Sequence, residues 1–207
     1  MGPVRVDRRT EARRRRASVE QVILDATEAL LADRAFRDLS IEEVMTRAGL
    51  TRTAFYRYFP DLEAVLIRHL MSAQAELGRA ADLWLSLDAD PRGGLLPAAT
   101  ALAEVFRRHG RLLLALSDAS AGSPDIEATW HAVVQAFVAP VQERIEGLCR
   151  QGLCHLDDPG QTAVALVWMN ERYLLETFGR GPGVPVDVAA QTIAGIWHGT
   201  LFGQARA

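Results

Sequence analysis

The sequence predicts an all-α protein, and three observations support this fold class. Apolar residues recur at spacings of three and four positions along most of the chain, which is the period of an amphipathic helix. No alternation of apolar and polar residues continues for more than a few positions, so we expect no β-sheet. Capping residues, glycines and prolines divide the chain into about nine helices. Apolar residues form 49% of the 207 residues, which is sufficient for a buried core.

The chain from residue 18 to residue 60 is predicted to form three short helices, preceded by a flexible basic arm at residues 1–17. Each helix starts at a residue that can cap an N-terminus: Ser18 with Gln21, Ser40 with Glu43, and Thr51. The second helix stops at Gly49 and the third at Pro60, because glycine favours the turn that ends a helix and proline cannot continue one. The first helix ends at about residue 34.

Residues 61–207 are predicted to form six further helices and a second, larger domain. Asp61, Ser123 and Asp158 can each cap one of them, and a proline follows the last two, where a first turn tolerates it. Segments rich in glycine and proline predict loops at 88–94 and 179–185. The predicted helices cover about residues 61–87, 95–109, 111–119, 123–152, 158–178 and 185–202.

Positive charge is concentrated at the N-terminal end. Residues 1–60 contain twelve arginines and nine acidic residues, whereas residues 61–207 contain eleven arginines and seventeen acidic residues. This asymmetry indicates an anionic partner for the N-terminal domain only. The chain has no apolar run long enough to span a membrane, and no apolar stretch follows the basic start as in a secretory signal. We therefore expect a cytoplasmic protein without a membrane partner.

The two cysteines, Cys149 and Cys154, are separated by four residues, which is neither a redox CxxC motif nor a zinc-ribbon pair. We interpret them as two reduced thiols at the end of a helix. A metal site with the adjacent His155 is the alternative, but a zinc site needs three or four ligands at compatible spacings. We expect no metal and no cofactor.

The stretch AGLTRTAFYRYFP, residues 48–60, carries aromatic and basic side chains on one short helix. At about 100° per residue, Phe55, Phe59 and most of Tyr58 turn toward one face, which we expect to be buried. The opposite face carries Arg52, Thr53, Tyr56 and Arg57. Two short helices joined by a glycine turn, the second with a basic and hydroxylic face, are typical of a helix-turn-helix.

These outward side chains suit DNA. Arginine can bind guanine edges, threonine can meet a thymine methyl group or a phosphate, and tyrosine can donate to a phosphate. The arginine run at residues 8–16 just before the first helix adds side chains that bind phosphates and narrow minor grooves. The alternatives are an ordinary amphipathic hairpin with a solvated face and a solvated basic tail.

The segment LSIEEVMTRAGLTRTAFYRYFPDLEAVL, residues 39–66, resembles the DNA-binding signature of TetR-family transcriptional regulators along its whole length. The resemblance implies that the third helix enters the major groove and that Tyr56 touches the DNA backbone. It also implies a homodimer formed by the last two helices, which binds an inverted-repeat operator in double-stranded DNA. The residues expected to contact DNA are Arg13, Arg14, Arg15, Arg16, Ser40, Thr51, Arg52, Thr53, Tyr56, Arg57 and Tyr58.

The segments at residues 166–179 and 194–203 resemble the EthR-like subgroup, which implies a long apolar ligand channel. Asn170 matches a pocket asparagine, and Val167 replaces a second polar pocket residue. Independently, Asn170 is the sole asparagine of the chain and lies in an apolar helix, where a buried amide needs a partner. A bond to a neighbouring helix or to a second protomer is the alternative. The residues expected to bind ligand are Leu102, Phe106, Trp130, Phe137, Val167, Asn170, Glu171, Leu174 and Trp197.

Together these features predict a ligand-responsive regulator, in which a small apolar or amphipathic ligand releases a repressor from its operator. The alternative is a helical small-molecule-binding protein or enzyme without DNA binding. The five histidines are scattered, and the sequence contains no HExxH motif, no nucleophile–base pair and no paired carboxylates on one helix face. We therefore expect no catalytic residues and no enzymatic activity.

Overall fold

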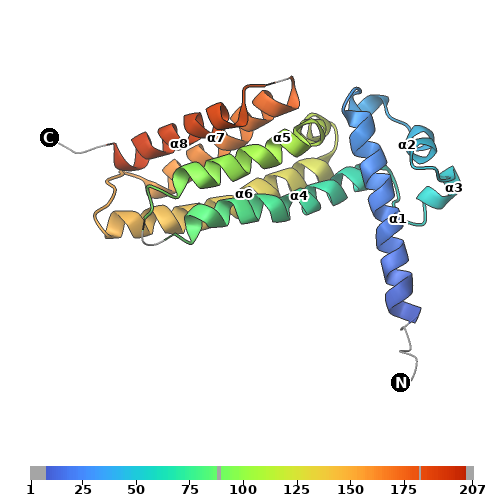
Figure 1. The fold of residues 1–207 in the computed structure, drawn as a ribbon, viewed down its shortest axis with the longest axis horizontal. Coiled ribbons are helices and arrows are strands. Elements are labelled where there is room, and N and C mark those ends of the chain that lie inside the picture. The colour runs from blue at the N-terminus through green and yellow to red at the C-terminus, as the bar shows by residue number, and fades with distance from the viewer. Residues whose placement is uncertain (1–7, 88–89, 182, 204–207) are drawn as a thin grey trace. The chain divides into compact units, whose positions relative to one another are not determined.

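The computed structural model describes residues 8–87, 90–181 and 183–203, and it confirms the all-α fold class (Figure 1). Within these residues there are eight α-helices, one 3-10 turn at Phe36–Asp38 and no strand. The α-helices are α1 (Arg8–Leu31), α2 (Ile41–Arg47), α3 (Arg52–Phe55), α4 (Leu62–Leu85), α5 (Leu95–Ser120), α6 (Pro124–Arg150), α7 (Pro159–Gly179) and α8 (Val186–Phe202). None of the helices in the described ranges is both long and apolar enough to cross a membrane.

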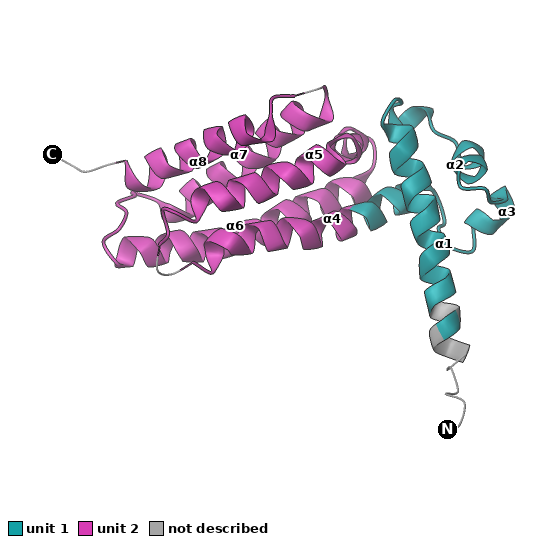
Figure 2. Ribbon diagram, in the orientation of Figure 1, with its two compact units in different colours: residues 1–69 teal, residues 70–207 magenta. Residues whose placement is uncertain are grey.

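The chain divides into two compact units, residues 1–69 and residues 70–207 (Figure 2). Helix α4 contributes residues to both units. The division falls later than the expected boundary after Pro60, because the first turns of α4 belong to the core of unit 1. Val65 is fully buried there and packs in one cluster with Phe55 of α3.

The predicted start of the first helix at Ser18 is wrong, since α1 begins at Arg8. The segment before Ser18 consists mainly of arginine, alanine and glutamate, which are good helix formers. Ion pairs one turn apart support it, between Arg15 and Glu11 at 3.8 Å and between Arg16 and Glu20 at 3.0 Å. Residues 8–17 of the expected arm are therefore helical, and residues 1–7 lie outside the described residues.

The core of unit 1 joins α1 to the helix pair α2–α3 and to the start of α4. The buried cluster consists of Ile23, Leu24, Ala26, Val44, Met45, Phe55, Phe59 and Val65. Polar contacts bind α4 to α1 as well: the imidazole Nε2 of His69 lies 2.9 Å from the carbonyl oxygen of Leu24. The guanidinium of Arg68 donates to Glu20 at 2.9 Å. The position of α2 and α3 on α1 thus depends on apolar packing, whereas polar contacts also join α4 to α1.

In unit 2, α5 packs against α6, α7 and α8, and α6 also packs against α7. The prediction of two helices over residues 95–119 is wrong, because α5 continues through Gly110. A Cβ atom on Gly110 would lie 2.6 Å from the carbonyl oxygen of Phe178, and a Cβ on Gly179 would lie 3.0 Å from the carbonyl oxygen of Gly110. The two glycines therefore allow the backbones of α5 and α7 to approach closely.

The interpretation of Cys149 and Cys154 as free thiols is also wrong, because the structure joins them in a disulfide. Helix α6 ends at Arg150, and Gly152 just beyond it has a φ of 74°, which permits the left-handed turn that reverses the chain. The amide of Leu153 donates to the carbonyl of Leu148 at 3.0 Å across this turn. The reversal brings the Cα atoms of the two cysteines to 4.6 Å. Among the described residues, no group of three or more His, Cys, Asp or Glu side chains is placed to hold a metal.

Candidate DNA-binding surface and ligand cavity

A capped helix and a glycine turn position α3. The Ser40 hydroxyl accepts from the backbone N–H of Glu43 at 3.3 Å, and the Ser40 N–H donates to the Glu43 carboxylate at 2.9 Å, so the predicted capping box is confirmed. At the other end of α2, Gly49 has a φ of 69°, and the N–H of Leu50 donates to the carbonyl of Met45 at 2.8 Å. This hydrogen-bonded turn sets the direction in which α3 leaves α2.

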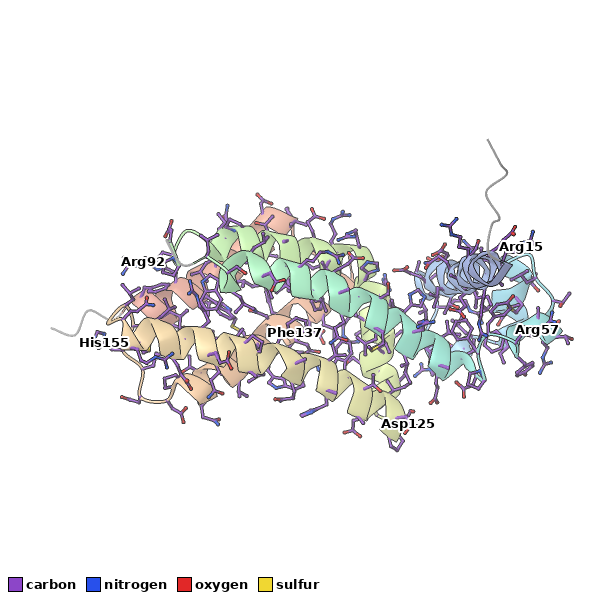
Figure 3. The ribbon with its side chains drawn as sticks, turned by 90° about the horizontal axis from the view of Figure 1, so that it is seen from below. Arg15, Arg57, Arg92, Asp125, Phe137 and His155 are labelled. Carbon is purple, nitrogen blue, oxygen red and sulfur yellow. A yellow bond between two sulfur atoms is a disulfide. The ribbon has the colours of Figure 1, made fainter. Side chains whose placement is uncertain are left out.

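The aromatic and basic faces of residues 52–59 separate as predicted. Phe55 is fully buried and Phe59 is 5% exposed, so these two rings anchor the segment in the core of unit 1. The side chain of Tyr56 is 54% exposed. Arg52, Thr53 and Arg57 are also exposed, and Figure 3 shows Arg57 at the surface of unit 1. Helix α3 is shorter than predicted, since the chain continues from Tyr56 as a turn.

Tyr58 and the arginines of α1 differ in burial and in their contacts with other side chains. Tyr58 is half-buried, and the guanidinium of Arg16 lies 6.0 Å from its ring centroid. Arg16 also forms its ion pair with Glu20. Burial raises the pKa of Glu20, but hydrogen bonds from Arg68 and Arg16 lower it by more than burial raises it. The net effect is a pKa below the ordinary value of glutamate. Arg14 and Arg15 are exposed, whereas the side chain of Arg13 lies outside the described residues.

Charge at the start of α2 holds the capping box together. The guanidinium of Arg34 donates to the carboxylate of Glu43 and to the backbone carbonyl of Asp38. The Arg34 contact and the bonds from Ser40 lower the pKa of Glu43 from 4.5 to about 2. Thr51 occupies the same N-cap position on α3, but its side chain makes no capping hydrogen bond. Thr51 is exposed at the start of the basic face.

Unit 2 contains an apolar, partly open cavity of about 130 Å³ between α4, α5, α6, α7 and α8. Eight of the nine expected ligand residues line it: Leu102, Phe106, Trp130, Phe137, Val167, Asn170, Glu171 and Trp197. Phe137 lies on α6 among the helices of this unit (Figure 3). Leu174 is fully buried but does not line the cavity, so it contributes to the core instead.

Sequence reasoning missed the contribution of α4 and most of that of α5. The further lining residues are Leu70, Leu77, Ala80, Ala81, Trp84, Leu85, Leu95, Ala98, Ala99, Leu113, Val133, Val134, Val141, Ile193 and Ala194. Trp84 is 4% exposed, and its ring lies edge-on to Trp197 at a centroid distance of 5.3 Å. The apolar stripe of α4 was visible in the sequence. Its periodicity does not distinguish a side chain that fills a core from one that borders a cavity.

Two neighbouring residues of α7 supply polar groups to this cavity. The Oδ1 atom of Asn170 accepts a hydrogen bond from the indole Nε1 of Trp197 at 3.0 Å. Asn170 therefore bonds a neighbouring helix and also lines the cavity. Glu171 is 7% exposed, and neither of its carboxylate oxygens has a hydrogen-bond partner among the described residues. Burial, and secondarily the charge of Glu176, raise the pKa of Glu171, although Arg172 and Trp130 oppose the shift.

The outer face of α8 carries two exposed apolar side chains and lacks side chains at two glycines, among polar residues such as Gln191 and Thr192. Val188 and Ile196 are 42% and 44% exposed. A Cβ atom on Gly195 or Gly199 would meet nothing within 4 Å among the described residues. Exposed apolar residues interleaved with glycines leave this helix face open to close packing by another helix.

Comparisons with known proteins agree with both parts of this arrangement. The family described as "Bacterial regulatory proteins, tetR family" matches residues 23–68, and "Transcriptional regulator EthR, C-terminal domain" matches residues 96–203. The HTH-type transcriptional regulator EthR of Mycobacterium tuberculosis is 31% identical over 191 residues, covering 90% of this chain and 88% of that protein. EthR of Mycolicibacterium smegmatis is 26% identical over 190 residues, covering 89% and 86%. A solved structure of a TetR-family regulator from Syntrophomonas wolfei has a TM-score of 0.72 at 15% identity, covering 88% of this chain and 94% of that one.

Proposed function

Because the chain belongs to the TetR family of helix-turn-helix transcriptional regulators, with a C-terminal domain of the EthR type, we propose that it is a cytoplasmic repressor that a small ligand releases from DNA. The family places the chain among regulators of transcription and not among enzymes. The observation that carries the proposal is the exposed face of Arg52, Tyr56 and Arg57 on a segment anchored by buried Phe55 and Phe59.

The basic face is suited to the major groove. A rigid segment that presents two guanidinium groups and a phenol can combine base recognition with phosphate contacts. The buried rings of Phe55 and Phe59 fix the segment in the core of unit 1. The polar atoms of the arginines and the tyrosine are not needed for this packing. Thr51 and Thr53, both exposed at the start of the segment, add hydroxyl groups for phosphate oxygens. We assign Arg52 to base contact and Tyr56 to the backbone.

A homodimer would present two such segments to the two halves of an inverted repeat, about 34 Å apart. The exposed apolar residues Val188 and Ile196 of α8 support a dimer formed through the last two helices, because such residues are typical of subunit contacts. The cavity between α4 and α8 supports a ligand of mainly apolar character. A ligand weakens DNA binding only if it binds the DNA-free state more tightly than the DNA-bound state.

Selection of genomic DNA fragments by the purified protein tests directly whether the protein binds a specific DNA sequence. We expect enrichment of an inverted repeat. Arg52→Ala should reduce affinity for that repeat by about 1–3 kcal/mol and relax the preference at one position of each half. Arg150→Ala serves as the matched control, since this exposed arginine lies at the end of α6 in unit 2. Failure to enrich any repeat at low salt would favour the alternative of a ligand-binding protein without DNA binding.

A further inference from the structure

Glu171 is the one acidic side chain that lines the cavity, as judged from the residues that the structure describes. The Glu171 side chain is 7% exposed, and both of its oxygens lack hydrogen-bond partners among those residues. A buried carboxyl group without a partner is unfavourable, and burial correspondingly raises the pKa of Glu171. A ligand that donates hydrogen bonds to the carboxylate oxygens would supply the missing partner.

Arg172 and Asn170 do not fill that role, and the indole of Trp130, although it lowers the pKa of Glu171, makes no hydrogen bond to either oxygen. The guanidinium Nε of Arg172 lies 3.8 Å from a carboxylate oxygen of Glu171, which is beyond hydrogen-bond distance. The Arg172 side chain is 56% exposed and pairs also with Glu176 at 3.5 Å. Asn170 directs its amide oxygen to Trp197 and is thereby an acceptor already in use. Both oxygens of Glu171 are thus buried without a hydrogen-bond donor among the described residues.

The rest of the lining favours a cation. Five aromatic side chains border the cavity: Trp84, Phe106, Trp130, Phe137 and Trp197. The faces of aromatic rings attract cations, and aromatic walls combined with a carboxylate are well suited to ammonium groups. In a buried site, an ion pair with good hydrogen-bond geometry also offsets the desolvation of both partners.

We propose that Glu171 is the anchor of a ligand that carries a protonated amine on an apolar body. This inference rests on the proposed ligand-binding function of the cavity and specifies the chemical class of the ligand. The ammonium group donates hydrogen bonds to the carboxylate of Glu171, and the apolar body occupies the space between α4, α5 and α6. When Glu171 is protonated in the empty cavity, its proton leaves to solvent as the ammonium ion binds, so charge and protons balance.

The volume indicates which probes to use. An apolar cavity of roughly 150 Å³ in another protein binds benzene. The cavity of about 130 Å³ is similar in size and partly open, so it suits a single ring with a short polar arm. A matched series consists of 2-phenylethylamine, 2-phenylethanol and phenylacetate, which share the ring and differ in the charge and donor capacity of the terminal group. Binding to the full chain is measured by calorimetry and by thermal denaturation.

We expect the amine to bind more tightly than the alcohol, and phenylacetate to bind least, because its negative charge meets Glu171. Glu171→Gln should weaken amine binding about ten- to hundredfold and leave alcohol binding nearly unchanged, since a neutral amide loses the charge-assisted bonds. Glu143→Gln is the control, because that acid is exposed on α6 and does not line the cavity. It should leave amine affinity unchanged within about threefold, as expected for an exposed charge.

Equal binding of amine and alcohol, unchanged amine affinity in Glu171→Gln, or no amine binding up to millimolar concentration would overturn the proposal. The denaturation curve of the ligand-free variant establishes that Glu171→Gln is folded. DNA binding is measured separately. If the amine binds through Glu171 but leaves DNA affinity unchanged, the ligand class stands and the release mechanism fails. If DNA is released by neutral ligands alone, the release mechanism stands and the role of Glu171 fails.

Discussion

The hydroxyl groups of Ser40 and Thr51 occupy equivalent positions at the N-termini of α2 and α3, but their surroundings differ. Ser40 is part of a capping box, whereas the Thr51 side chain makes no capping bond. Ser40→Ala should therefore lower the free energy of unfolding by about 1 kcal/mol. Thr51→Ala should lower the free energy of unfolding by less than Ser40→Ala does. Its main effect should be weaker operator binding. Urea denaturation and fluorescence anisotropy with operator DNA measure the two effects. Equal stability losses would contradict this division.

The carboxylate of Glu43 makes the stability of unit 1 depend on pH. Its pKa is about 2 in the folded protein, below its ordinary value of 4.5, mainly because Arg34 donates to it. A group with a lowered folded pKa contributes stability that is present above pH 4.5 and is lost as the pH falls toward 2. Glu43→Gln keeps the side-chain acceptor of the capping box but removes the charge.

We expect the wild type to be more stable than Glu43→Gln at neutral pH. The difference between their melting temperatures should shrink as the pH falls from 4.5 to about 3. Thermal denaturation followed by circular dichroism over this range is the measurement. Glu42→Gln, at the exposed neighbouring position, controls for general loss of acidic charge. A difference that is constant with pH would show that the Arg34 contact has no influence on stability.

At the scale of elements, the approach of α5 to α7 depends on Gly110. Alanine at this position would place a Cβ atom 2.6 Å from a carbonyl oxygen of α7. Gly110→Ala should therefore lower the free energy of unfolding by about 1–3 kcal/mol through displacement of the helices. The matched control is Gly78→Ala in α4, where a Cβ atom meets nothing within 4 Å. That variant should stabilise the protein by up to about 1 kcal/mol, because alanine favours a helix. Similar effects of both variants would contradict the close packing.

At the scale of the whole molecule, the exposed apolar residues of α8 should control assembly. Ile196 and Leu83 are each 44% exposed, on α8 and α4 respectively, which makes them a matched pair. If α8 forms the subunit contact, Ile196→Glu should convert the dimer to a monomer by placing a charge in an apolar interface. Leu83→Glu should leave the dimer intact. Light scattering after size-exclusion chromatography measures the mass, and a dimer that survives Ile196→Glu would exclude this interface.

The basic segment of α1 should determine how DNA affinity responds to salt. Arg14 and Arg15 are exposed, whereas Arg16 is paired with Glu20. Each lost phosphate contact reduces the slope of log affinity against log salt by about 0.9. The double variant Arg14→Ala/Arg15→Ala should therefore reduce the slope of a dimer by up to roughly 3–4. Arg16→Ala should reduce it less. DNA affinity measured at several salt concentrations tests this prediction. An unchanged slope in the double variant would show that Arg14 and Arg15 make no phosphate contacts.

The sequence by itself determined those features that depend on neighbours a few residues apart. Helical periodicity separated buried Phe55 and Phe59 from exposed Arg52 and Tyr56. The spacing from Ser40 to Glu43 specified a capping box, because both partners lie within one helical turn. The all-α class follows from the same local period, summed over the chain. Eight of the nine expected ligand residues line the cavity, and the resemblance supplied most of them, because it carries information about distant contacts that periodicity lacks.

Only the tertiary structure decided features that depend on partners distant in sequence. Gly110 resembles a helix end in the sequence, but the backbone of α7 beside it explains a glycine within a continuous helix. Leu174 shares the apolar character of the cavity residues, yet the packing of α7 places it in the core. In the sequence, Glu171 is an ordinary acidic residue of a helix. Its burial becomes evident only when the surrounding helices are placed. In each case the deciding atoms belong to another helix, and local sequence patterns carry no information about which helix that is.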